Sequence, residues 1–223
     1  MTHSIPAAQP AFSLPRLFVS AMVALLVTSL GLGVALASHQ IPTWKAKDAK
    51  GRTVNTSAMA GKVQIITISN PDYKYKKATD KALQVIAGNF GSADDVGQLT
   101  LVDLRGMNWA KYQAADVSGE LEKRMVKAHD RIAKRIAKAL GKEGDAAAKS
   151  KIDKGLHLIP LREDKIIHHY KPWTSDTTEN NLILVVVDKS GKFNKFWKIK
   201  KGTGEAAIDK TLAELKSTVE GLR

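Results

Sequence analysis

Basic side chains are the residues of this 223-residue sequence with the clearest capacity for chemistry, and many of them fall in one stretch. Residues 120–142 contain eight Lys or Arg residues against three Asp or Glu residues. Ammonium and guanidinium groups bind carboxylates, phosphates and other anions, and this binding weakens as the salt concentration rises. We predict a surface that binds a protein or a polyanion, formed by Lys123, Arg124, Lys127, Arg131, Lys134, Arg135 and Lys138. The alternative is an ordinary charged helix face in contact with water.

Two aromatic segments are further candidates for binding. Residues 73–77 read Tyr-Lys-Tyr-Lys-Lys, a mixture that suits base stacking, an aromatic anchor in a protein interface, or a helix start with half-buried tyrosines. Trp173 follows a proline and precedes a polar loop, so it is the tryptophan that we expect at an interface. No established nucleic-acid motif accompanies these residues, and we therefore expect a protein partner in preference to nucleic acid.

Metal binding and catalysis find little support in the sequence. Cysteine is absent, which excludes disulfides, thiolate metal sites and every thiol-based reaction. The histidines concentrate at His157, His168 and His169, but adjacent residues of a strand point to opposite faces and could not easily bind one ion. No serine-hydrolase, zinc-protease or phosphate-loop motif occurs. We predict no metal site, no cofactor and no catalytic residue.

The first 37 residues have the three parts of a secretory signal. Arg16 is the basic residue, Leu17–Ala37 is an uncharged apolar stretch, and an Ala-x-Ala pattern ends at Ala37. We predict cleavage after Ala37, which leaves an exported chain of residues 38–223 with no transmembrane segment. The alternative is an uncleaved membrane anchor, because 21 apolar residues are long enough to span a bilayer. The exported chain is expected to be periplasmic or secreted.

Hydrophobic spacing predicts a sheet covered by helices. The composition, 43% hydrophobic and 26% charged, is that of a globular domain, and the net charge of +13 favours anionic partners. The predicted helices cover residues 76–88, 118–140 and 205–222. Apolar residues fall on one face of the last two helices: Leu121, Met125, Ala128, Ile132, Ile136 and Leu140 in the second, and Ile208, Leu212, Leu215 and Val219 in the third. The predicted strands cover residues 63–68, 99–104, 182–187 and 193–199, the last two joined as an antiparallel hairpin by a tight turn at Asp188–Gly191.

This order of elements resembles the thioredoxin-like superfamily, in its thiol peroxidase and TlpA-like branch. The lead-in to the first core strand carries the resemblance: Ile41-Pro42-Thr43-Trp44, then Asp48-Ala49-Lys50-Gly51, then Ala60-Gly61-Lys62. The resemblance covers residues 41–104 and 182–222. It implies a central mixed sheet flanked by helices, with a long basic helical insertion at about residues 118–156 before the C-terminal hairpin. Within this insertion, Gly141, Gly144 and the run Ala146–Lys151 indicate a break or a flexible loop.

The sequence lacks the residues that carry out redox chemistry in that family. Redox-active relatives place one or two cysteines between the first core strand and the following helix, and the pattern puts Tyr73 and Lys76 near those positions. The cis-proline that precedes the third core strand in the family is also missing, since residues 178–181 read Thr-Glu-Asn-Asn. The resemblance therefore implies a redox-inactive fold that is reused for binding.

These observations predict an exported, non-catalytic binding protein. We expect a scaffold or accessory subunit of a cell-envelope assembly, with an envelope protein as partner and an anionic polymer or lipid headgroups as alternative partners. Two other functions stay open: a carrier for an anionic or apolar small ligand, and an enzyme of non-thiol chemistry. A deep pocket between the insertion and the sheet would favour the carrier, and converging titratable groups in a pocket would favour the enzyme.

Overall fold

The computed structural model describes residues 39–70, 76–91, 93–104, 119–161, 166, 169–170 and 181–223. These residues belong to one compact unit that begins at His39. The predicted targeting segment, Tyr73 and Trp173 lie outside the described residues. Within the described ranges, no helix combines the length and the apolar character that a membrane span requires.

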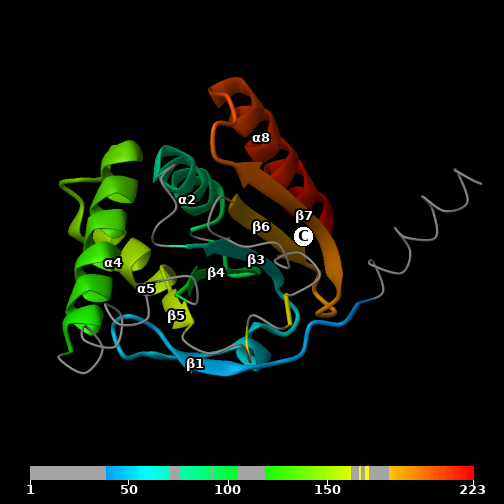
Figure 1. The fold of residues 1–223 in the computed structure, drawn as a ribbon, viewed down its shortest axis with the longest axis horizontal. Coiled ribbons are helices and arrows are strands. Elements are labelled where there is room, and N and C mark those ends of the chain that lie inside the picture. The colour runs from blue at the N-terminus through cyan, green and yellow to red at the C-terminus, as the bar shows by residue number, and fades with distance from the viewer. Residues whose placement is uncertain are drawn as a thin grey trace, which may run out of the picture. The chain divides into compact units, whose positions relative to one another are not determined.

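A mixed sheet of five strands forms the centre of this unit (Figure 1). Its order is β5 (Leu158–Leu161), β4 (Val96–Asp103), β3 (Val63–Ser69), β6 (Asn181–Val187) and β7 (Phe193–Lys200). β3, β4 and β5 are parallel, whereas β6 and β7 join on as an antiparallel hairpin. All seven residues of β3 are buried, because this strand lies in the middle of the sheet. The sheet confirms the predicted fold class and the predicted hairpin.

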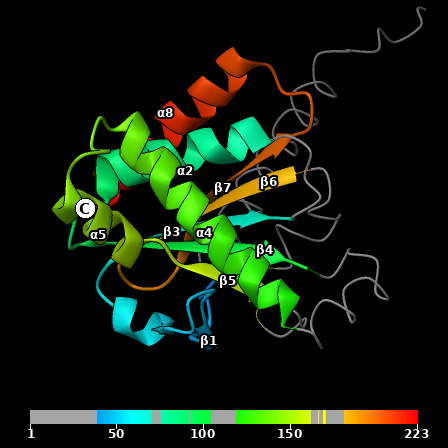
Figure 2. The ribbon, with the colours of Figure 1, turned by 90° about the vertical axis from the view of Figure 1, so that its left-hand side faces the viewer.

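Three helices cover one face of the sheet: α2 (Lys76–Phe90), α4 (Glu120–Ala139) and α8 (Glu205–Leu222). In Figure 1, α2 and α8 lie above the strands and α4 lies to their left, and Figure 2 shows α4 crossing in front of β4. α2 contacts both of the other helices. Hydrophobic spacing predicted the inner face of α8, and the structure confirms that face. The buried residues of this helix are Ile208, Leu212, Leu215 and Val219.

The N-terminal hairpin lies on the other side of the sheet in Figure 1, and it consists of β1 (Lys45–Lys47) and β2 (Thr53–Asn55), followed by the short helix η1 (Thr56–Met59). Trp44, just before β1, is buried and donates a hydrogen bond from its indole Nε1 to the Tyr170 hydroxyl at 3.0 Å. Burial raises the pKa of Tyr170 above its ordinary value, so this hydroxyl stays neutral. Trp44 is therefore a core residue.

The predicted insertion lies before the C-terminal hairpin, but its second half differs from the prediction. Residues 146–151 were expected to form a break or a flexible loop, and instead they belong to helix α5 (Ala146–Gly155). The Asp145 side chain caps this helix by accepting a hydrogen bond from the Ala148 amide at 2.9 Å, and three consecutive alanines favour the helical backbone. α5 packs against α4 and leads into β5.

The orientation of α4 makes a testable prediction about stability. Ile136→Ala is expected to lower the free energy of unfolding by about 2–5 kcal/mol, because the change leaves a cavity in the core. Leu140→Ala is the matched control, with an expected loss of about 1 kcal/mol or less. Both residues belong to the same predicted apolar stripe, but Ile136 is 2% exposed and Leu140 is 36% exposed. Chemical denaturation measures both values, and equal losses would contradict this orientation.

Candidate functional site

The seven predicted bases form one surface of α4, which we call the cationic arc. At about 100° per residue along a helix, they fall within an arc of about 120°. Its residues are all exposed, and they are Lys123, Arg124, Lys127, Arg131, Lys134, Arg135 and Lys138. The opposite side of the helix is apolar and buries Leu121, Met125 and Ile136. The structure thus brings the predicted bases of α4 together on a helix that is fixed by its opposite side.

Ion pairs neutralise only part of the cationic arc. Arg124 pairs with Glu120 one turn earlier, with 3.2 Å between Nε and Oε1, and Arg135 pairs with Asp80 of α2. In the described part of the chain, no ion pair involves the other five bases of the arc. α4 contains three acidic residues, Glu120, Glu122 and Asp130. Asp130 pairs with Lys50 of the N-terminal hairpin and not with a base of the arc. Five exposed bases of the arc therefore carry positive charge that no described residue neutralises through an ion pair.

A pocket between α2 and α4 adjoins one side of the cationic arc. This α2–α4 pocket has a volume of about 300 Å³ and lies where β3 and β4 end. Ser69 at the end of β3, Asn70 just after it, and Arg131 and Arg135 of the arc all line it. In open α/β sheets, ligands bind in the crevice beyond the carboxyl ends of the strands. The pocket thus occupies the part of the fold where function is commonly found.

The other predicted site residues are not brought into this group. Lys76 is the first residue of α2, and the structure describes no position for its side chain. Tyr73 and Trp173 lie outside the described residues, so their predicted roles remain predictions. Among the described residues, the end of β3 is accompanied by hydroxyl, amide and guanidinium groups instead of thiols.

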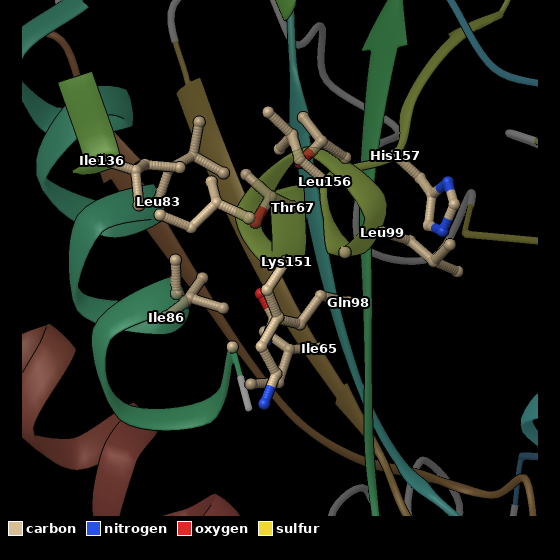
Figure 3. A pocket seen from close by; sticks show the side chains of 15 residues that line it. Ile65, Thr67, Leu83, Ile86, Gln98, Leu99, Ile136, Lys151, Leu156 and His157 are labelled. Carbon is tan, nitrogen blue, oxygen red and sulfur yellow. The ribbon is translucent and has the colours of Figure 1, made fainter. Parts of the chain in front are cut away.

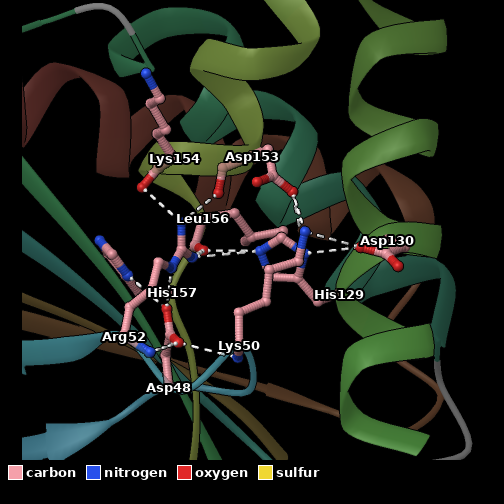
Figure 4. Close-up of polar contacts among 9 residues, drawn as sticks. All are labelled: Asp48, Lys50, Arg52, His129, Asp130, Asp153, Lys154, Leu156 and His157. Carbon is pink, nitrogen blue, oxygen red and sulfur yellow. Dashed lines mark hydrogen bonds and ion pairs between the residues drawn. The ribbon is translucent and has the colours of Figure 1, made fainter. Parts of the chain in front are cut away.

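A second group of polar side chains, which the sequence did not predict, lies around the buried carboxylate of Asp48 (Figure 4). One of its oxygens accepts hydrogen bonds from the backbone amides of Lys50 and Arg52, at 3.0 and 2.9 Å. The other oxygen lies 2.7 Å from Arg52 Nε and 3.0 Å from His157 Nδ1. Burial opposes the ionisation of Asp48, but the hydrogen bonds from His157 and Arg52 outweigh it and hold the pKa of this carboxyl below its ordinary value.

Arg52 extends this group to the end of α5. Its guanidinium donates to the carbonyl oxygens of Asp153 and Leu156, at 2.9 and 2.7 Å. The last carbonyls of a helix have no partner within the helix, and a cation near them also interacts favourably with the helix dipole. Arg52 therefore caps α5 from the N-terminal hairpin, more than 100 residues away in the sequence.

His129 of α4 completes the group, which we call the Asp48–His129 network. This side chain is fully buried, and its Nε2 donates to the Leu156 carbonyl at 3.0 Å. Its Nδ1 lies 3.4 Å from a carboxylate oxygen of Asp130 and 3.5 Å from one of Asp153. The ligand atoms of these three side chains lie within 4.8 Å of one another, a spacing that a metal ion could bridge. The ammonium of Lys50 already compensates both carboxylates, at 2.5 Å from Asp153 and 3.1 Å from Asp130.

His157 and Asp48 have the geometry of an oriented imidazole, but the adjoining crevice is small (Figure 3). A carboxylate on Nδ1 leaves Nε2 of such a histidine available for proton transfer. The crevice beside His157 has a volume of about 30 Å³, room for one or two water molecules, and its walls include Ile65, Leu99 and Leu156. The His157–Asp48 pair therefore contributes to the packing around α5.

Comparison with known proteins identifies the fold and nothing finer. No protein-family model matches the chain, and no curated protein matches it in sequence. A hypothetical protein from Sinorhizobium meliloti shares the fold with a TM-score of 0.51 and 11% identity, over 83% of each chain. An exposed lipoprotein thioredoxin from Streptococcus pneumoniae gives a TM-score of 0.44 at 18% identity, over 78% of this chain and 99% of its own. A secreted Mycobacterium tuberculosis disulfide oxidoreductase gives 0.43 at 14% identity, over 80% and 96%.

These comparisons agree with the predicted resemblance. Structural neighbours of the chain are thioredoxin-like proteins, whereas the chain itself has no cysteine. The order β5-β4-β3-β6-β7, with a helical insertion before β5, is the predicted mixed sheet with its insertion. At identities of 9–18%, this likeness concerns the fold alone.

The lowered pKa of Asp48 makes a prediction about stability and pH. Asp48→Asn is expected to lower the free energy of unfolding by about 3 kcal/mol at pH 7, because Arg52 and His157 lose a buried charged partner. Since the folded-state pKa lies below the unfolded value of about 3.9, the contribution of the carboxylate is complete above that value and disappears as the pH falls through the folded pKa.

Urea denaturation at pH 7 and pH 3 of the wild type and the variant measures this difference. The stability gap between the two proteins should be smaller at pH 3. Asp94→Asn, at an exposed carboxylate just before β4, is the control and should change stability little at either pH. A gap that is equally large at both pH values would contradict the role given to the Asp48 charge.

Proposed function

We propose that this protein is an exported, non-catalytic binding protein that holds an acidic partner protein of the cell envelope on the cationic arc. In this proposal it works as a scaffold or accessory subunit and performs no thiol chemistry, because the chain has no cysteine. Export rests on Arg16, the apolar stretch Leu17–Ala37 and the Ala-x-Ala pattern. The observation that carries the proposal is the set of five bases on one side of α4 that have no ion pair among the described residues.

The fixed position of α4 supports a role for these charges in recognition. Leu121, Met125 and Ile136 anchor the helix through its buried side, and His129 ties it to the loop after α5. Charges presented by a rigid element bind a complementary surface without a large cost for ordering that element. Lysine and arginine side chains at the rim of an interface mainly increase the association rate and make binding sensitive to salt.

The distribution of acidic residues also supports a partner outside this chain. Two acidic residues of α4 have ion pairs in the described part of the chain, Asp130 with Lys50 and Glu120 with Arg124 of the arc. Arg135 is the one arc residue with an ion pair to another element in the described part of the chain, through Asp80. A charged helix face that is merely solvated usually mixes both signs, whereas seven of the eight charged α4 residues in this sector of about 120° are basic and Glu120 is the one acid.

The first experiment identifies the partner. Mild crosslinking in cells of a C-terminally tagged protein, followed by purification from the envelope fraction and mass spectrometry, should give reproducible crosslinks from α4 to one or a few envelope proteins. A monomer without crosslinks would contradict the scaffold role.

Charge reversal then tests the surface. The quadruple variant Lys127→Glu, Arg131→Glu, Lys134→Glu and Lys138→Glu changes only arc residues without an ion pair among the described residues. Its affinity for the identified partner, measured without crosslinker, should fall at least about tenfold, and the wild-type affinity should fall with rising salt.

The control carries the same change of charge on another part of the molecule. Its substitutions are Lys192→Glu, Lys200→Glu, Lys201→Glu and Lys210→Glu, all at exposed positions around β7 and α8. This variant should bind within about twofold of the wild type. Equal losses in both variants would show that net charge, and not the arc, determines binding.

A further inference from the structure

The α2–α4 pocket combines an apolar wall with a cationic rim. Val102 of β4, Leu158 of β5, and Met125 and Ile132 of α4 form the apolar part. Arg131 and Arg135 stand at the rim, where the pocket meets the cationic arc. A volume of about 300 Å³ is at the lower end of the range for sites that bind small molecules.

We propose that this pocket binds a small amphiphilic monoanion, a carboxylate attached to an apolar body. The apolar body lies against Val102, Met125, Ile132 and Leu158, and the carboxylate pairs with Arg131. A planar guanidinium matches the two oxygens of a carboxylate, so arginine suits this role better than lysine. Met125 offers a polarizable thioether that makes favourable contacts with an aromatic body.

The charges at the rim determine that the ligand carries a single negative charge. Arg131 has no ion pair among the described residues, whereas Arg135 is bound to Asp80, which also lines the pocket. The two guanidinium groups and the one carboxylate leave a net charge of one positive unit. A monoanion neutralises this charge, and a dianion would leave negative charge next to Asp80.

Polar groups at the end of β3 also line the pocket. Ser69 and Asn70 are both buried, and Thr79 of α2 lies near the rim. Hydroxyl and amide groups of this kind fix the orientation of a ligand without adding charge. The site thus differs from the cationic arc, which offers exposed charge and no apolar wall, and the inference goes beyond the proposed scaffold function.

Calorimetry with 4-phenylbutyrate as the probe tests the ligand class on the protein purified as the cell produces it. The matched compounds are 4-phenylbutan-1-ol, which lacks the charge, 4-phenylbutylamine, which reverses it, and acetate, which lacks the apolar body. Each should bind at least about tenfold more weakly than 4-phenylbutyrate, a difference of about 1.4 kcal/mol. Equal binding of the alcohol would overturn the role of the carboxylate, and absence of binding by 4-phenylbutyrate would overturn the site.

Two variants locate the binding within the pocket. Arg131→Gln should weaken the binding of 4-phenylbutyrate about tenfold, whereas Lys127→Gln, on the same arc but outside the pocket, should leave it within about twofold. Binding that responds equally to both changes would place the probe on the arc instead of in the pocket.

A gain of affinity provides the sharpest test, because a misfolded variant cannot produce it. Asp80→Asn removes the one carboxylate at the rim and releases Arg135, so 4-phenylbutyrate should bind about three- to tenfold more tightly. Asp209→Asn is the matched control: it removes a carboxylate of α8 that pairs with Lys81 of α2, with the same change in net charge. Equal effects of both substitutions would reduce the result to net charge and overturn the inference. Since the measured quantity is the binding of 4-phenylbutyrate and no partner protein is present, the outcome is independent of the scaffold function.

Discussion

The guanidinium of Arg52 is the contact on which the arrangement of the inserted elements depends. It joins a buried carboxylate of the N-terminal hairpin, Asp48, to the carbonyl oxygens at the end of α5. The same Leu156 carbonyl also accepts a hydrogen bond from His129 of α4. One side chain thus connects three segments that are far apart in the sequence, and an unpaired guanidinium or carboxylate at this depth would be costly.

This connection explains how α4 tolerates many like charges on one side. Lysine and arginine residues three or four positions apart on a helix destabilise it by mutual repulsion. Burial of Leu121, Met125 and Ile136, together with the hydrogen bond of His129, offsets that repulsion from the opposite side. The acidic residues that could have neutralised the arc are used elsewhere: Asp130 and Asp153 both contact Lys50. The same network therefore fixes the helix, and five bases of the arc have no ion pair among the described residues.

Hydrophobic spacing was sufficient to predict the sheet and the main helices, but not the Asp48–His129 network. Core positions repeat at regular intervals along one element, as in α8, so they can be read from a single sequence. The partners of Arg52 are mostly backbone carbonyls more than 100 residues away, and such acceptors carry no side-chain signature. β5 escaped prediction because it has only four residues, one of them proline. His129 escaped because its burial depends on α5, which was itself expected to be a loop.

The position of the α2–α4 pocket follows from the sheet and not from the chemistry of any relative. Parallel strands end at the same edge of the sheet, and in open α/β sheets a crevice lies beyond their carboxyl ends. Ser69 and Asn70, at the end of β3, supply a hydroxyl and an amide group to this space. The insertion then brings Arg131 and Arg135 to the same space from α4. Apolar residues of the strands and guanidinium groups of the insertion therefore meet at one location that the fold itself keeps open.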